Sequence, residues 1–84
     1  MGYVYVLELS DGMYYIGSTK NIENRIQTHQ NGDSHYTRRK LPCKLLAYKE
    51  HKTYTEARIQ EIFLKKSKSR KITEQFISEN RKIG

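Results

Sequence analysis

The fold is decided by residues 3–18, which read YVYVLELSDGMYYIGS. β-Branched and aromatic residues dominate both 3–9 and 13–18, and both kinds of residue favour strands. Between them, residues 10–12 (Ser-Asp-Gly) are a turn signal, because glycine supplies positive φ and aspartate tolerates turns. The pattern therefore predicts a β-hairpin.

The length of the hairpin loop decides which side chains share a face. A two-residue loop places Tyr5 and Tyr15 on opposite faces of the hairpin. A three-residue loop shifts the register by one residue and places both tyrosines on the same face. The sequence is compatible with both registers, and only the second one brings the two phenols together.

One further strand and three helices are expected after the hairpin. Asn21 is a good N-cap and Asn31-Gly32 a good stop for the first helix. A chain of 84 residues forms one domain with a small core, so we predict a single α+β domain over residues 1–84. The expected elements are a helix at about 22–30, a strand at 44–50, helices at about 55–66 and 71–80, and a basic linker at 67–71.

The chain carries a large positive charge. It has 16 Lys and Arg against 9 Asp and Glu, a net charge of +7, which favours a polyanionic partner and most simply nucleic acid. An acidic membrane surface is the competing partner. No apolar run is long enough to span a bilayer, and the N-terminus lacks the apolar core of a signal peptide, so we expect a cytoplasmic protein that does not enter membranes.

Arg25 and His29 fall in the apolar stripe of the first helix. At about 100° per residue they share this stripe with Ile22 and Ile26, so they lie on the side that packs toward the sheet. A helix needs no arginine there for stability, which suggests a functional role. The alternative is that both side chains lie at the edge of the stripe and extend outward to solvent.

Glu61 falls between Ala57 and Leu64 on a projection of the helix at 55–66. A carboxylate inside an apolar stripe is costly unless something binds it. The alternative is a surface ion pair with Lys65, worth a few tenths of a kcal/mol. The same helix carries apolar residues on a second side: Ile59, Ile62 and Phe63. We therefore expect it to pack against more than one neighbour.

Residues 32–43 carry no periodicity and are expected to form a loop. Its basic cluster, Arg38, Arg39 and Lys40, can contact phosphates if it lies beside the hairpin, and is otherwise a solvated run of charge. Cys43 has no CxxC partner and is interpreted as a packing residue. A zinc site would have to combine His29, His35, His51 and Cys43. No two of them have the spacing of a ligand pair, which disfavours zinc.

Taken in order, these motifs resemble the GIY-YIG nuclease family. Residues 15–17 (Tyr-Ile-Gly) match the second half of the family signature. Residues 3–5 (Tyr-Val-Tyr) resemble the first half, with Tyr3 in place of the usual glycine and the final tyrosine kept. The spacings from Tyr15 to Arg25 and from Arg25 to His29 also match. The resemblance continues to Phe76, and an ordered set of this length is far more specific than any tripeptide.

The resemblance extends to the metal-binding helix of the family. Residues 56–65 are similar to the helix that carries the metal-binding glutamate, here Glu61. Family members have a three-stranded antiparallel sheet flanked by helices, and this chain is similar to the catalytic domain of the excision-repair incision subunit. Ser18 stands where some relatives have lysine, and Asn80 is a candidate for an asparagine that other members carry.

What the resemblance implies is hydrolysis of DNA phosphodiester bonds with one divalent cation, Mg²⁺ or Mn²⁺, in DNA repair or recombination. Glu61 would bind the metal. A single carboxylate ligand suits Mg²⁺, because this ion keeps most of its waters. Arg25 would hold a phosphate oxygen, and Tyr5 with His29 would orient or deprotonate water. Tyr15 would position the phosphate. The residues expected to contact nucleic acid are Arg38, Arg39, Lys40 and Lys65.

A different class of function is a nucleic-acid-binding module without catalysis. The charge and the tyrosines serve binding equally well, because phosphate contacts and base stacking need no metal. A binding module does not need a carboxylate that faces a phosphate, so Glu61 argues against this class. A dependence of cleavage on Mg²⁺ would separate the nuclease from the binding module. The substrate is expected to be DNA, branched or damaged forms included. RNA and the oligomeric state stay open.

Overall fold

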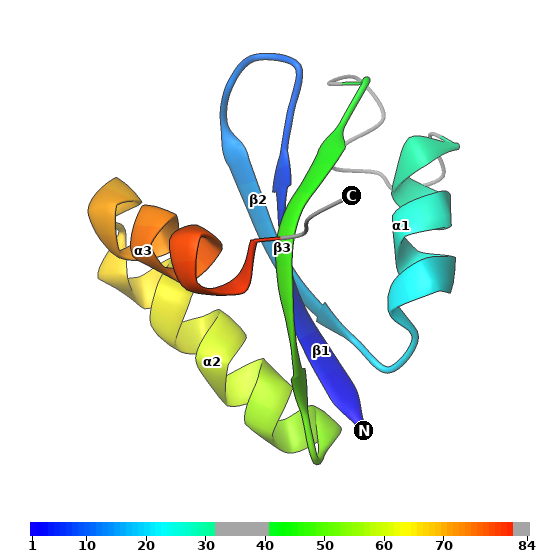
Figure 1. Cartoon of the computed structure of the whole chain (residues 1–84), viewed down its shortest axis with the longest axis vertical. Helices are drawn as coiled ribbons and strands as arrows, with labels where there is room; N and C mark the ends of the chain where they lie inside the picture. The colour runs from blue at the N-terminus through cyan, green and yellow to red at the C-terminus, as the bar shows by residue number, and fades with distance from the viewer. Residues whose placement is uncertain (32–40, 82–84) are drawn as a thin grey trace.

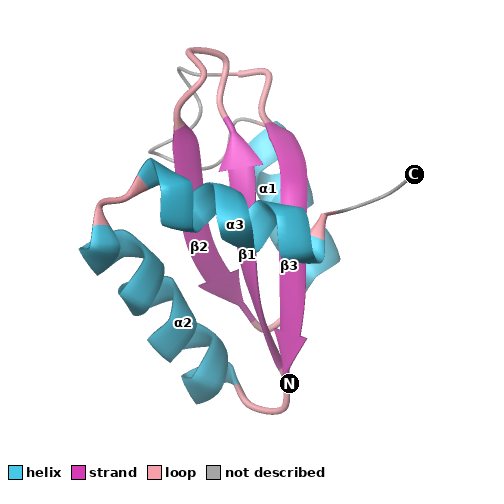
Figure 2. Ribbon diagram, turned by 60° about the vertical axis from the view of Figure 1, so that its left-hand side comes forward, coloured by secondary structure: helices cyan, strands magenta, loops and turns pink. Residues whose placement is uncertain are grey.

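The computed structural model describes residues 1–31 and 41–81 (Figure 1). Its elements are β1 (Gly2–Glu8), β2 (Tyr14–Thr19), α1 (Ile22–Gln30), β3 (Lys44–His51), α2 (Tyr54–Ser67) and α3 (Arg70–Asn80). The sheet is antiparallel with the order β2-β1-β3. Helix α1 covers one face, and α2 and α3 cover the other (Figures 1 and 2). None of these helices is long and apolar enough to cross a membrane.

The hairpin adopts the register that the site requires. Tyr5 pairs with Gly17, and the loop between the last backbone-paired residues holds three residues, 10–12. Gly12 has a φ of 82°, which only glycine adopts readily. Tyr5 and Tyr15 therefore point to the same face, as the three-residue loop predicted.

Each face of the sheet has its own apolar core, because side chains alternate along the strands. The core on the α1 side contains Tyr5, Leu7, Leu9 and Cys43. The core on the α2–α3 side contains Val4, Val6, Ala47, Leu64 and Phe76. Burial of Cys43 confirms that it is a packing residue.

Helix α2 uses only one of its two apolar sides for packing. Ala57, Glu61 and Leu64 are buried, whereas Ile59 is 62% exposed and Phe63 is 60% exposed. The expectation that this helix packs against more than one neighbour is confirmed, because α2 contacts both the sheet and α3, but its second apolar side stays exposed. The physical reason is that α2 lies on the sheet beside α3, so its outer side faces away from both (Figure 2).

The connection between α2 and α3 is shorter than the expected basic linker at 67–71. Helix α2 continues through Ser67 and α3 begins at Arg70, so two residues remain between the helices. Ser69 caps α3 by accepting a hydrogen bond from the Ile72 amide. Lys68 makes the reversal with a φ of 49°.

Candidate active site

The hydroxyl of Tyr5 is the centre of a polar cluster between β1 and α1. Its Oη lies 3.1 Å from His29 Nε2, and Arg25 Nε donates a hydrogen bond to it over 3.2 Å. Arg25 and His29 are four residues apart and so share one side of α1. Tyr5 is 1% exposed and His29 is fully buried. The prediction that both α1 residues face the sheet is confirmed.

Tyr15 completes this cluster from β2. Its ring centroid lies 6.4 Å from that of Tyr5 and 5.0 Å from that of His29, with an edge-on approach to the imidazole. The pKa of the Arg25 guanidinium is raised, first by its hydrogen bond to Tyr5 and to a smaller extent by Tyr15. Four of the five predicted catalytic residues therefore lie together on the α1 side of the sheet.

Burial controls the protonation of this cluster. It lowers the pKa of His29 to about 4, with a further contribution from the positive charge of Arg25. It also raises the pKa of Tyr5 to about 12, although the hydrogen bond from Arg25 acts in the opposite direction. The effect of burial on the pKa of Tyr5 thus outweighs that of Arg25. At neutral pH the phenol is protonated and the imidazole is neutral.

Burial of neutral His29 predicts a pH dependence of stability. The pKa of His29 is about 4 in the folded chain and about 6.5 in the unfolded chain, so the unfolded chain binds more protons between these values. The free energy of unfolding therefore rises with pH through this window and levels off above it. We expect a loss of about 2 kcal/mol between pH 7.5 and pH 5, measured by urea unfolding.

The matched control is the other described histidine. The imidazole Nε2 of His51 lies 2.6 Å from Gln60 Oε1, at a half-buried position away from this cluster. His29→Gln should flatten the pH dependence above pH 5, and His51→Gln should leave it as in the wild type. An equally steep profile in His29→Gln would contradict the assignment.

Gly17 makes room for the Tyr5 ring. A Cβ atom at this position would lie 2.5 Å from Tyr5 Oη and 2.6 Å from Tyr5 Cζ. Real Cβ atoms do not approach other atoms so closely, so any other residue here would displace the phenol. The absence of a side chain at Gly17 thus allows the close approach of Tyr5.

Glu61 is the centre of a second cluster, on the α2 side of the sheet. Its side chain is 4% exposed; Lys65 Nζ lies 2.7 Å from Oε2, and Arg58 Nη1 lies 2.9 Å from Oε1. Ser18 Oγ also donates to Oε1. Burial raises the pKa of the Glu61 carboxyl, but the hydrogen bonds from Lys65, Ser18 and Arg58 together lower it below its usual value. Glu61 is therefore ionised at neutral pH, buried as predicted and also paired with Lys65.

The two clusters meet at the edge strand β2. Gly17 pairs with Tyr5 on the α1 side, and its neighbour Ser18 contacts Glu61 on the other side, because successive residues of a strand face opposite ways. The negative charge of Glu61 is the smallest of the causes that raise the pKa of Tyr5. Residues 17 and 18 thus link the Tyr5 cluster on one face of the sheet to the Glu61 carboxylate on the other.

Two partners of Glu61 were missed in the sequence. Ser18 was noted only as a departure from relatives that have lysine there, and Arg58 was not singled out. Arg58 lies three residues before Glu61 on the same helix, a spacing that brings side chains together. Ser18 has no comparable local signal, because its contact with Glu61 joins residues 43 positions apart.

The carboxylate of Glu61 fits a divalent cation. Its Oε2 atom is paired with Lys65, and the Lys65 side chain is 52% exposed, so it can move to solvent. The described residues contain no group of three or more His, Cys, Asp or Glu side chains placed to hold a metal. A single carboxylate suits Mg²⁺, which keeps several of its waters.

Asn80 joins neither cluster, and other predicted residues lie outside the described part of the chain. Arg38, Arg39 and Lys40 lie outside the described residues, as does His35 of the zinc alternative. Asn80 donates its side-chain amide to the carbonyl of Phe76 within α3, over 3.0 Å. Of the residues expected to contact nucleic acid, the structure describes Lys65 alone.

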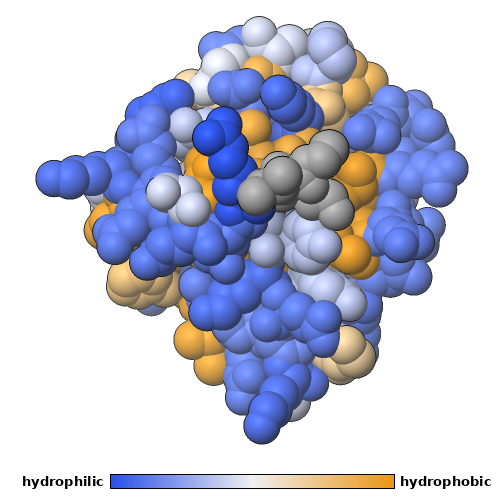
Figure 3. Space-filling model, in the orientation of Figure 1, coloured by the Kyte–Doolittle hydropathy of each residue, from blue (hydrophilic) through white to orange (hydrophobic). Residues whose placement is uncertain are grey.

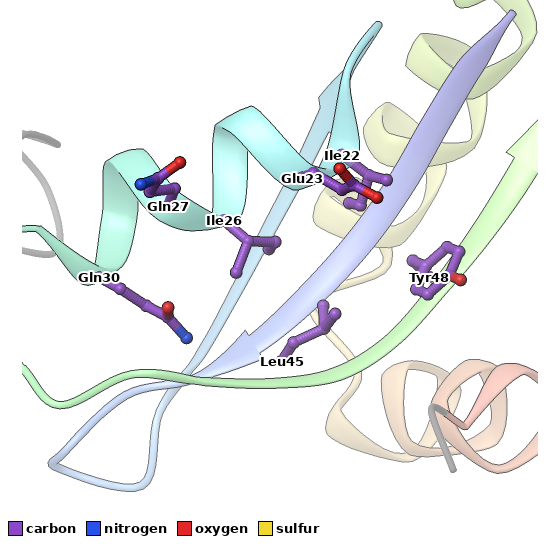
Figure 4. Close-up of a pocket in the computed structure, with 7 residues that line it drawn as sticks. All are labelled: Ile22, Glu23, Ile26, Gln27, Gln30, Leu45 and Tyr48. Atoms are coloured by element: carbon purple, nitrogen blue, oxygen red, sulfur yellow. The ribbon is translucent and has the colours of Figure 1, made fainter. Parts of the chain in front are cut away.

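Helix α1 covers only part of its face of the sheet. A groove of about 470 Å³ opens between α1 and β3 (Figure 4). Its apolar residues are Ile22, Ile26, Leu45 and Tyr48, and its polar ones are Glu23, Gln27 and Gln30. Figure 3 shows apolar residues along the inner border of α1 on a face that is otherwise mostly hydrophilic. The half of the face beside β1 and β2, which holds the Tyr5 cluster, is the part that α1 closes.

Comparison with known proteins agrees with this fold. Residues 1–74 match the family model described as the GIY-YIG catalytic domain, which is a nuclease-type family. The chain belongs to the GIY-YIG family. The match confirms the resemblance and, with the sheet described above, the predicted fold.

The relatives cover most of the chain. A UPF0213 protein of Bacillus licheniformis is 45% identical over 83 residues, which are 98% of this chain and 84% of that protein. A UPF0213 protein of Streptococcus pneumoniae serotype 4 is 43% identical over 79 residues, 93% of this chain and 79% of that one. The solution NMR structure of a UPF0213 protein from Bacillus halodurans has a TM-score of 0.59 and 38% identity, covering 93% of this chain and 84% of that chain.

Proposed function

We propose that this protein is a divalent-metal-dependent endonuclease that hydrolyses DNA phosphodiester bonds. The observation that carries the proposal is the position of the Tyr5 hydroxyl, held between Arg25 Nε at 3.2 Å and His29 Nε2 at 3.1 Å. A phenol, a cation and a neutral base therefore meet in one hydrogen-bonded cluster on the buried side of α1. It suits a site that moves a proton beside a phosphate.

Each residue of the α1 cluster has a role that its chemistry allows. The Arg25 guanidinium supplies a fixed positive charge and planar donors for a non-bridging phosphate oxygen. Neutral His29 can accept a hydrogen bond from the Tyr5 hydroxyl at Nε2, and the phenol oxygen beside Arg25 can then accept a hydrogen bond from the attacking water. Tyr15, edge-on to His29, fixes the imidazole ring and lines the position of the phosphate. This role of His29 needs the neutral form, which its low pKa provides at pH 7.

Glu61 would hold the metal ion, Mg²⁺ or Mn²⁺. When bound, such an ion supplies positive charge that stabilises the phosphate and the leaving oxygen in the transition state. Without a metal ion, Lys65 and Arg58 form ion pairs with the carboxylate oxygens of Glu61. These contacts lower the pKa of Glu61 and keep it ionised. The net charge of +7 supports a nucleic-acid substrate, with DNA in repair or recombination as the proposed setting.

The test is nicking of supercoiled plasmid and of a branched DNA by the purified protein, in Mg²⁺ or in EDTA. Tyr5→Phe removes one oxygen atom at the centre of the cluster. We expect it to slow nicking by about 100-fold or more, the range for loss of a proton-transfer group. Tyr3→Phe is the matched control, because Tyr3 lies on the same strand and face and contacts Tyr48 instead. It should cleave like the wild type.

The outcomes separate the two classes of function. Cleavage that needs Mg²⁺ and the Tyr5 hydroxyl supports the nuclease. Salt-sensitive binding of DNA without product at any Mg²⁺ concentration would instead support the non-catalytic binding module. Nicking by Tyr5→Phe at the wild-type rate would remove Tyr5 from the mechanism.

A further inference from the structure

A basic hollow lies beside the proposed metal ligand, on the α2–α3 side of edge strand β2. It has a volume of about 260 Å³ and is formed where the α2–α3 connection approaches β2. The residues that matter here are Tyr14 and Ile16 of β2, Lys65 and Lys68, and Ser69 and Arg70 at the start of α3. Among the described residues that line it, three are cations and none is a carboxylate. We call this feature the basic hollow.

Two of its cations contact neighbouring side chains. Lys65 Nζ lies 2.7 Å from Glu61 Oε2, so the hollow begins at the carboxylate. Arg70 lies over the ring of Tyr14, with its Cζ 4.3 Å from the ring centroid. Glu74 sits behind this pair and receives hydrogen bonds from Tyr14 Oη and Arg70 Nε. The stacking on Tyr14 and the ion pair with Glu74 together hold the guanidinium beside β2.

The third cation, Lys68, occupies a strained position. It ends α2 in the left-handed conformation, with φ 49° and ψ 21°. Glycine is the usual residue at such a helix end, because every other side chain crowds the backbone there. Positive charge near the C-terminus of α2 is already supplied by Lys65 and Lys66. The helix end therefore does not explain a lysine at 68, and strain of this kind collects at functional sites.

We propose that the basic hollow binds the phosphate backbone of the strand being cut, a few nucleotides from the scissile phosphate. The proposal rests on the proposed function for its substrate. Ser18, the β2 contact of Glu61, and Tyr14, the β2 contact of Arg70, are four residues apart, or about 13 Å of strand. The phosphates of one B-DNA strand advance about 3.4 Å per nucleotide along the axis. The hollow thus holds the backbone within about four nucleotides of the scissile phosphate.

The test measures binding without cleavage. A fluorescent DNA duplex is titrated in EDTA by anisotropy, at several salt concentrations, with wild type, Lys68→Gly and Arg70→Gln. Loss of one phosphate contact weakens binding about five- to tenfold at 0.1 M salt and reduces the slope of log K against log salt by about 0.9. Lys66→Gln is the matched control, since Lys66 is an exposed lysine of α2 that does not line the hollow.

Lys68→Gly keeps the test independent of folding. Glycine relieves the left-handed strain, so this variant should unfold at a Tm about 3 °C above the wild type while binding DNA more weakly. The proposal is supported if the slope of log K against log salt is reduced in Lys68→Gly and Arg70→Gln but stays at the wild-type value in Lys66→Gln. Equal slopes in all three variants, or wild-type affinity in Lys68→Gly, overturn it. If the variants differ in their salt slopes as expected but the protein does not cleave DNA in Mg²⁺, the result counts against the nuclease. It still supports the basic hollow as a phosphate-binding site.

Discussion

Replacing Glu61 with glutamine is expected to reduce metal-dependent nicking by about 1,000-fold or more, because a neutral amide is a far weaker ligand for Mg²⁺ than a carboxylate. The fold should survive. The substitution keeps the size of the side chain, and its former partners Arg58 and Lys65 are 53% and 52% exposed at their side chains, so both can turn to solvent. The measurement is the nicking rate as a function of Mg²⁺ concentration.

The control for this variant is Glu56→Gln. Glu56 lies on the same helix and is exposed, so the two variants lose the same charge. We expect Glu56→Gln to nick DNA at the wild-type rate. If Glu61→Gln stayed within about threefold of the wild type, Glu61 would be a structural partner of Arg58, Lys65 and Ser18 and the metal would be held elsewhere.

Replacing Gly17 with alanine is expected to have the largest effect on stability. Its Cβ would fall 2.5 Å from Tyr5 Oη, and the Tyr5 ring is buried with no open space to move into without losing Arg25 and His29. Overpacking of this kind costs about 1–3 kcal/mol. We expect a lower free energy of unfolding in urea together with loss of nicking, because the phenol leaves its position.

Gly12→Ala separates this steric effect from the conformational effect of losing a glycine. A Cβ at Gly12 meets no atom within 4 Å, but the residue has a φ of 82°. The variant should lose about 1 kcal/mol of stability through backbone strain and keep its activity. Gly17→Ala with wild-type nicking would mean that the Tyr5 position is not needed for catalysis.

Local signals in the sequence predicted most of the fold. Alternating β-branched and aromatic residues gave the hairpin, and the Asn21 cap gave the start of α1 at Ile22. The helical spacing of Arg25 and His29 placed both on the buried side. These features depend on neighbours within a few residues, so they can be predicted from the sequence alone.

Contacts between distant segments were not predictable in the same way. The exposed side of α2, with Ile59 and Phe63, has the same local pattern as a packed side, and only the placement of α3 decides between them. The contact of Ser18 with Glu61 depends on how α2 crosses β2. The protonation of Tyr5 depends on its total burial, which no spacing of residues reveals.

The three-residue turn at residues 10–12 has a consequence for how this chain can vary. Every side chain of β2 changes face when one residue is inserted or deleted between the strands, unless a bulge absorbs it. Tyr15 would then leave the phenol cluster, and Ser18 would leave Glu61, in the same event. A change in the number of turn residues is therefore tolerated only where the loop itself absorbs it and the pairing of Tyr5 with Gly17 is kept, and within the turn Gly12 is held by its positive φ.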